Sequence, residues 1–170
     1  MFVDSISLAP YVATPVNVVR EMLRIADVRP GETVYDLGCG DGRIAITAAL
    51  EFGARGVGVD INQNLVREAR KRVEELHLGD RVKIIHGNLL EIDLSQADVV
   101  TMYLTTSANE KVRPKLEQEL KPGARVVTHD FLIPKWEVNS SVKVQGEYRT
   151  HIIYLYVWKP KEGARPAIKR

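Results

Sequence analysis

The sequence predicts an α/β fold, built as a doubly wound sheet of seven strands that is mostly parallel and ends in an antiparallel hairpin. Short β-rich segments alternate with segments whose apolar residues recur at helical spacing, which is typical of a parallel sheet covered on both faces. A cluster of glycines joins the first strand to a helix. Residues 141–158 contain two β-rich runs separated by a short gap with Gly146, which indicates the hairpin.

The first helix is expected to begin at Thr14 and Pro15. Thr14 would be the N-cap, and Pro15 would take the first helical position, where its missing N–H costs nothing. Apolar residues then recur at helical spacing, at Val16, Val19, Leu23 and Ala26. Pro30 and Gly31 end this run.

Five strands are expected to follow in order, each separated from the next by a helical or irregular segment. They are residues 33–37, 56–60, 82–87, 97–104 and 124–131. The run over 97–104 is apolar almost throughout, as a central strand buried on both faces should be. Asn62 is expected to cap the helix that follows the second strand.

The helix after the fourth strand is harder to delimit. Ser107 and Glu110 have the spacing of a capping box, which would begin a helix at Ser107. Pro114 would interrupt a helix begun there, because it lacks an N–H and its ring clashes with the preceding turn. We therefore expect the regular helix to start at Pro114 and to end at 121–123.

Length and composition predict one globular domain over residues 1–158 and a basic, flexible tail over 159–170. The chain has 170 residues, of which 45% are hydrophobic and 27% charged, and its formal net charge is +2. No apolar run spans a bilayer, no signal peptide is evident at the N-terminus, and Cys39 is the single cysteine. A reducing cytoplasm is the expected location, with no membrane partner.

The glycine cluster lies in VYDLGCGDGR, residues 34–43, with glycines at 38, 40 and 42. A loop between a strand and a helix places a bound group beside backbone N–H donors. A P-loop would need a lysine after the glycines, a dinucleotide loop needs its third glycine one residue later, and an EF-hand needs alternating acids that are absent. The ligand is therefore of another kind.

The G-x-G-x-G spacing, preceded by Asp36, resembles motif I of the class I S-adenosylmethionine-dependent methyltransferases, whose fold is Rossmann-like. This resemblance implies S-adenosylmethionine as cofactor, S-adenosylhomocysteine as product, and no metal. It also implies that Gly38 and Gly40 let the methionine part lie against the backbone, with Asp36 near the cofactor's amino group.

Two further strand ends fit the same cofactor. Asp60 ends the second strand, where a carboxylate can accept both ribose hydroxyls, although a turn-forming role would also explain it. Ile61 would lie against the adenine. After the third strand, Asn88 is the candidate to receive the adenine amino group, with Leu89 beside it, and the alternative is a simple Gly-Asn turn.

The chain also resembles, over residues 11–23 and 103–131, the small archaeal protein-lysine methyltransferases and their mitochondrial relatives, distant kin of the Dot1 enzymes. The Tyr11-x-x-Thr14 spacing resembles the Dot1 entry loop, so residues 1–13 are expected to cover the cofactor. Dot1 proteins have an Asn-Asn pair after the fourth strand, where this chain has Leu104 and Thr105. Tyr103 is our catalytic candidate, as a wall of the lysine channel, although simple packing would also explain it.

The resemblance implies a protein substrate with an exposed lysine. Three alternatives stay open: a small-molecule enzyme of the corrinoid type, an RNA methyltransferase aided by the basic tail, and a module that binds the cofactor without catalysis. Nucleic acid is not favoured, because TMYLTTSAN at 101–109 lacks the proline pair of base-amino methyltransferases.

Cys39 is interpreted as a packing residue. His129 and Asp130 are interpreted as structural, because two ligands are too few for a metal site. His77, His86 and His151 are interpreted as isolated structural residues.

Overall fold

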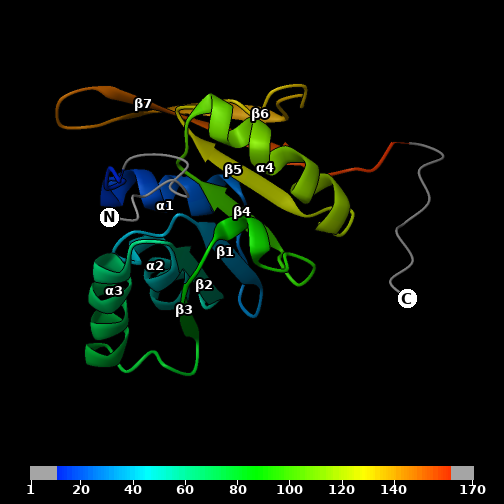
Figure 1. Ribbon diagram of the computed structural model, residues 1–170. Helices are drawn as coiled ribbons and strands as arrows, with labels where there is room; N and C mark the ends of the chain where they lie inside the picture. The colour runs from blue at the N-terminus through cyan, green and yellow to red at the C-terminus, as the bar shows by residue number, and fades with distance from the viewer. Residues whose placement is uncertain (1–10, 162–170) are drawn as a thin grey trace, which may run out of the picture.

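The computed structural model describes residues 11–161 and contains, over that range, one seven-stranded sheet with helices on its faces (Figure 1). The strand order is β3-β2-β1-β4-β5-β7-β6. The first five strands pair in parallel, and β7 pairs antiparallel with both β5 and β6. The predicted fold class is confirmed, including the C-terminal antiparallel hairpin.

The first five strands begin and end within two residues of their predicted bounds. Their bounds are β1 Thr33–Leu37, β2 Arg55–Asp60, β3 Val82–His86, β4 Val99–Met102, β5 Arg125–His129, β6 Ser140–Gln145 and β7 Thr150–Val157. The helices are α1 Val16–Ile25, α2 Arg43–Phe52, α3 Gln63–Glu75 and α4 Thr106–Glu119, with a short 3₁₀ turn, η1, at Leu89–Glu91. Asn62 caps α3 as predicted, since its side chain accepts from the amides of Asn64 and Leu65.

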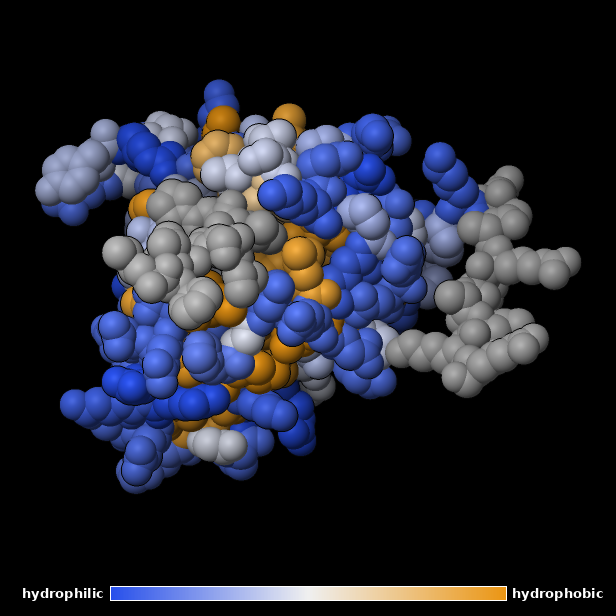
Figure 2. Space-filling model, in the orientation of Figure 1, coloured by the Kyte–Doolittle hydropathy of each residue, from blue (hydrophilic) through white to orange (hydrophobic). Residues whose placement is uncertain are grey.

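Two apolar layers hold the sheet between its helices. On one face α1 and α2 pack against Val34, Val99 and Val127. On the other face α4 packs against residues one position along the same strands, including Val100 and Val126, because successive side chains of a strand point to opposite faces. Hydrophilic side chains cover most of the face shown in Figure 2, and hydrophobic ones reach the surface in a band between them.

The predicted cap of the first helix is wrong. The helix α1 begins at Val16 with Pro15 as its N-cap, and the first helical bond runs from the Val19 amide to the Pro15 carbonyl at 2.9 Å. The Thr14 hydroxyl lies 3.3 Å from Nδ1 of His129 instead. A buried partner contributed by β5 therefore takes the side chain that the local sequence assigns to the helix end.

The prediction for the fourth helix is also wrong. The helix α4 runs unbroken from Thr106 to Glu119 with Pro114 in its interior, and its cap is Thr105, whose hydroxyl accepts from the Ala108 amide at 3.2 Å. Pro114 is exposed, whereas Val112 on the same helix is fully buried. Burial of the apolar face against the sheet outweighs the one hydrogen bond that the proline removes.

The predicted division of the chain stays a prediction. Most of the N-terminal segment 1–13 and most of the tail 159–170 lie outside the described residues. Among residues 11–161, none of the helices has the length and apolar character that crossing a bilayer requires.

Candidate functional site

A cavity of about 290 Å³ opens at the carboxyl ends of the parallel strands, where the strand order reverses between β1 and β4. Ligands of open α/β sheets bind at this topological switch point. Nine of the ten residues predicted for the site line the cavity. They are Tyr11, Thr14, Asp36, Gly38, Asp60, Ile61, Asn88, Leu89 and Tyr103.

Gly40, the tenth predicted residue, lies beside the cavity and shapes its loop. Its φ is +54°, and a Cβ at this position would overlap the ring of Tyr11, so only glycine allows the ring to lie so close. The Gly40 amide donates to Oδ2 of Asp60 at 2.8 Å, while the amide of Gly38 donates to the Val59 carbonyl at 2.8 Å. The loop is thus held against the end of β2.

Asp36 is a buried acid facing the cavity from β1. Its side chain is 3% exposed, and Oδ1 accepts a hydrogen bond from the Thr101 hydroxyl at 2.9 Å. Burial raises the pKa of Asp36 to about 7, the negative charges of Asp60 and Asp41 add to this, and the Thr101 hydrogen bond opposes it. A cation at this point of the cavity would favour the ionised form.

Asp60 uses both carboxylate oxygens in backbone hydrogen bonds. Oδ2 accepts from Gly40 and Oδ1 accepts from the Asn62 amide, each at 2.8 Å. Because a carboxylate has about four acceptor positions, both oxygens can still accept further donors from the cavity. Next to it, the carbonyl of Ile61 lies 3.0 Å from Nε2 of His86.

Asn88 closes the cavity after β3. Its Oδ1 accepts from the Leu90 amide at 2.9 Å and so caps the short turn η1, in which Leu89 is partly buried. This cap is the turn role that the sequence left open for Asn88. The second acceptor position of Oδ1 and the side-chain NH₂ group remain available in chemical terms for a ligand, since Asn88 also lines the cavity.

Tyr103 lies directly after β4, between the cavity and the end of β5. Its hydroxyl is 3.4 Å from Oδ2 of Asp130 and 3.2 Å from Nη2 of Arg149, and those two residues form an ion pair at 2.7 Å. Its ring packs against the ring of His129, with centroids 3.8 Å apart, and stacks with Phe131 at 6.3 Å. These contacts limit the rotation of the Tyr103 ring.

A pair of buried histidines behind Tyr103 is the part of the site that sequence reasoning missed. Nε2 of His129 lies 2.7 Å from Nδ1 of His151, which corrects the interpretation of His151 as isolated. Together with Asp130 these residues offer three possible metal-ligand atoms, which lie within 4.8 Å of one another. Arg149 already binds Oδ2 of Asp130 and the two imidazoles bind each other, so the contacts fit a hydrogen-bonded network better than a metal centre.

Asp41 and Arg43 anchor residues 11–14, which form the entry segment, and neither was predicted from the sequence to have a role. Asp41 forms ion pairs with Arg43 at 2.7 Å and with Arg72 at 3.0 Å. Nη1 of Arg43 donates to the carbonyl of Thr14 at 2.9 Å. The close spacing of an acid and an arginine in the glycine loop was the available signal in the sequence.

Cys39 is buried, and burial raises the pKa of its thiol well above the usual range, which supports its interpretation as a packing residue.

Comparison with known proteins shows two close similarities over most of the chain. The model of the ANTKMT methyltransferase domain matches residues 36–140. A protein-lysine N-methyltransferase of Saccharolobus islandicus is 52% identical over 149 residues, which cover 87% of this chain and 92% of that protein.

A solved structure titled as an RNA methyltransferase from Salinibacter ruber, in complex with S-adenosyl-L-homocysteine, is 45% identical with a TM-score of 0.83. It covers 89% of this chain and 95% of that one. The mouse adenine nucleotide translocase lysine N-methyltransferase is 35% identical over 81% of this chain, which spans 58% of the mouse protein.

Proposed function

Because this chain belongs to the ANTKMT methyltransferase domain family, we propose that it transfers methyl groups from S-adenosylmethionine to lysine side chains of proteins. The observation that carries this proposal is the cavity at the switch point, whose wall brings together the ends of β1, β2 and β4 and the turn after β3. The bound S-adenosyl-L-homocysteine of the Salinibacter structure supports the choice of cofactor.

The residues of the cavity fit the cofactor. The carboxyl of Asp36 would hold the amino group, and Gly38 and Gly40 would let the methionine part lie near the backbone. The carboxylate of Asp60 would accept the ribose hydroxyls.

The remaining predicted residues would hold the adenine and cover the cofactor. Ile61, Leu89 and Asn88 would contact the adenine, and Tyr11 and Thr14 would close the cavity from the entry segment. When bound, S-adenosylmethionine supplies an electrophilic methyl group.

The chemistry of lysine sets a clear demand on the protein. With a pKa near 10.4, a lysine must lose a proton before its nitrogen can attack, which costs about 4–5 kcal/mol at pH 7. A partly buried wall lowers that cost, because removal of water disfavours the ammonium form. Tyr103 is our candidate for this wall, and its ring face can also hold a methylated ammonium by cation–π attraction.

A protein target is supported by relatives that are named for different protein substrates. The Saccharolobus relative is named a protein-lysine N-methyltransferase, and two mouse relatives are named for lysine methylation of adenine nucleotide translocase and of an ATP synthase component. The shared chemistry of these names is lysine in a protein. A location in the cytoplasm is part of the same proposal and rests on the single cysteine.

RNA is the second candidate substrate, and one observation favours it: the Salinibacter structure, 45% identical, is titled an RNA methyltransferase. The five basic residues of 159–170 would suit a phosphate backbone. Against it, the segment after β4 reads TMYLTTSAN at 101–109, without the proline pair of the base-amino methyltransferases. We therefore rank lysine first.

One labelling experiment separates the two substrates. The purified protein is incubated with methyl-labelled S-adenosylmethionine and a cell extract, and matched samples are digested with protease or nuclease before mass spectrometry. Label on lysine residues is the expected result. Label on nucleotides with none on protein would overturn the proposal, and the Asp60→Ala variant serves as the control for transfer without a competent cofactor site.

A further inference from the structure

The buried pair His129 and His151 lies outside the cavity but touches two of its walls. His129 ends β5 with 0% exposure, and His151 is the second residue of β7 with 6% exposure. Neither belongs to the residues that line the cavity. Any role in methyl transfer must therefore pass through the residues they contact.

The first contact is with Thr14. Nδ1 of His129 lies 3.3 Å from the Thr14 hydroxyl, and the carbonyl of Thr14 accepts from Arg43. Thr14 is 5% exposed and lines the cavity. The histidine thus contacts the side chain of a residue whose backbone carbonyl is bound by Arg43.

The second contact is with Tyr103. The ring of His129 supports the ring of Tyr103 at a centroid distance of 3.8 Å and an interplanar angle of 30°. The outer end of Tyr103 is held by Asp130 and Arg149. Without the imidazole behind it, the phenol ring would lose its inner support and could turn about its Cα–Cβ bond.

His151 completes the arrangement by fixing the plane of His129. The bond between their nitrogens, at 2.7 Å, is the one that sets the rotation of the His129 ring, since the Thr14 contact is longer. Asp130 holds the end of β5 in register with β7 through two hydrogen bonds to Ile152. Its Oδ1 accepts from the Ile152 amide at 3.1 Å, and its own amide donates to the Ile152 carbonyl at 2.7 Å. Asp130 adopts a φ of +64°, a strained conformation that this pairing maintains.

Both imidazoles are neutral near pH 7. Burial lowers the pKa of His129 to about 4, and the Asp130 carboxylate opposes this shift. The Arg149 guanidinium, and the repulsion that a second protonated imidazole at His151 would bring, act in the same direction as burial. Burial also lowers the pKa of His151. A neutral pair holds one proton between the two nitrogens.

We propose that His129 and His151 are positioning residues for the transfer reaction. Through the contacts of His129 they hold Thr14 and Tyr103 in the positions that align the substrate amine in the cavity. This inference rests on the proposed function for the identity of the reaction. Misplacement of a reacting group by about 1 Å can lower the rate about a hundredfold, so the pair is expected to act on turnover more than on cofactor binding.

The test compares two variants at position 151. His151→Asn keeps a polar atom near the place of Nδ1, and His151→Leu removes it. We expect His151→Leu to lower kcat about 10- to 100-fold, with the Kd for S-adenosylmethionine by calorimetry within about threefold of wild type. We expect His151→Asn to stay within about threefold of wild type in both. Should His151→Leu fail to fold, His129→Gln against His129→Leu repeats the comparison.

Three results would overturn the inference. Equal kcat in all variants would mean that the pair positions nothing, and parallel losses of kcat and cofactor affinity would mean a general structural role. Activity lost on chelator treatment and restored by Zn²⁺ would mean that the pair binds a metal. The variants are assayed on whichever macromolecule the wild type labels, so label on RNA would refute lysine methylation while the positioning test still stands.

Discussion

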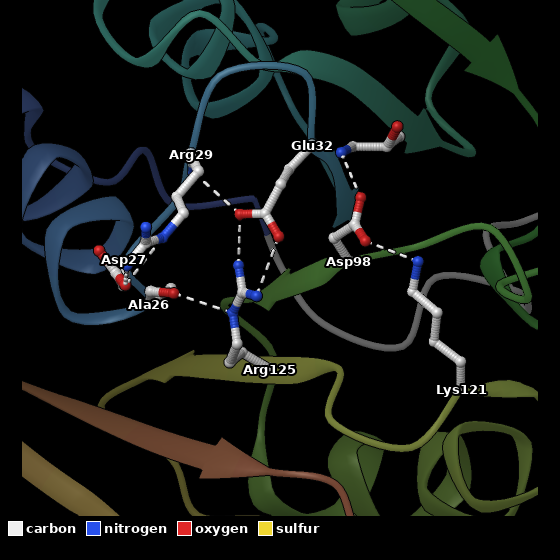
Figure 3. Close-up of polar contacts among 8 residues, drawn as sticks. Ala26, Asp27, Arg29, Glu32, Asp98, Lys121 and Arg125 are labelled. Atoms are coloured by element: carbon white, nitrogen blue, oxygen red, sulfur yellow. Dashed lines mark hydrogen bonds and ion pairs between the residues drawn. The ribbon is translucent and has the colours of Figure 1, made fainter.

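The amino edge of the sheet, where the parallel strands begin, and the carboxyl edge, where they end, differ in how their acidic residues are paired. At the amino edge, where β1, β4 and β5 begin, the guanidinium of Arg125 donates to both carboxylate oxygens of Glu32 at 2.5 and 3.0 Å (Figure 3). It also donates to the Ala26 carbonyl at 2.9 Å. Asp98 accepts from the Thr33 amide at 2.8 Å and pairs with Lys121 at 2.6 Å (Figure 3). Each acid there meets an opposite charge.

At the carboxyl edge, acids lie near one another around the cavity. Asp36 is buried with a hydroxyl as its hydrogen-bond partner, and the charges of Asp60 and Asp41 raise its pKa further. Asp41 has two arginine partners, whereas Asp60 is bound by backbone amides. The ion pairs of the amino edge therefore stabilise the fold, whereas the carboxyl oxygens of Asp36 and Asp60 keep acceptor positions for a ligand. The predictions below test this contrast.

The largest effect is expected for Asp60→Ala. The substitution removes the proposed acceptor of the ribose hydroxyls and also the acceptor that holds Gly40, so charge-assisted hydrogen bonds of about 1.5–3 kcal/mol each are lost. The affinity for S-adenosylmethionine is expected to fall about a hundredfold or more, as measured by calorimetry. Unchanged affinity would show that Asp60 does not hold the cofactor.

The matched change at the other edge is Arg125→Met, which keeps the aliphatic stem but removes the bidentate pair with Glu32. Both side chains are about four-fifths buried, so we expect unfolding free energy to fall by about 2 kcal/mol in denaturant titrations. Cofactor affinity should stay within about twofold of wild type. If Arg125→Met weakened binding as much as Asp60→Ala, the two edges would not be separable.

A smaller effect is expected from pH, through Asp36. Its pKa is raised to about 7, so the folded protein favours the neutral acid, and this contribution to stability is lost as pH rises from the unfolded value toward 7. A cationic amino group requires the carboxylate, so cofactor affinity should change in the opposite direction. It is expected to rise about eightfold from about pH 5.5 to about pH 6.5.

Calorimetry in buffers of different ionisation enthalpy tests the same linkage directly, because cofactor binding should release close to one proton at the lower pH. The variant Asp36→Asn is the control, since it has no proton to release and should show a flat affinity over this range. A steep rise that persists in Asp36→Asn would assign the titration to another group.

The sequence could predict which residues line the cavity because most of them stand at or just after the end of a strand. Asp36 lies near the end of β1, Asp60 ends β2 and Asn88 comes two residues after β3, and parallel strands bring their carboxyl ends to one edge of the sheet. The pairing of His129 with His151 depends instead on the register between β5 and β7, 22 residues apart in the chain, which no local pattern encodes. Local rules also failed at Thr14, whose hydroxyl contacts the buried His129, and at Pro114, where burial of the apolar face of α4 outweighed the proline's disruption of the helix.

The smallest effect is expected for Tyr103→Phe, and it divides the role of Tyr103 into ring and hydroxyl. The hydroxyl contacts Asp130 and Arg149 at 3.4 and 3.2 Å, distances that indicate weak hydrogen bonds, while the ring keeps its packing on His129. We therefore expect kcat to fall only about three- to fivefold, with cofactor affinity unchanged. A loss above about a hundredfold would mean that the hydroxyl takes part in proton transfer, and the carboxyl edge would then supply a general base as well as a shaped wall.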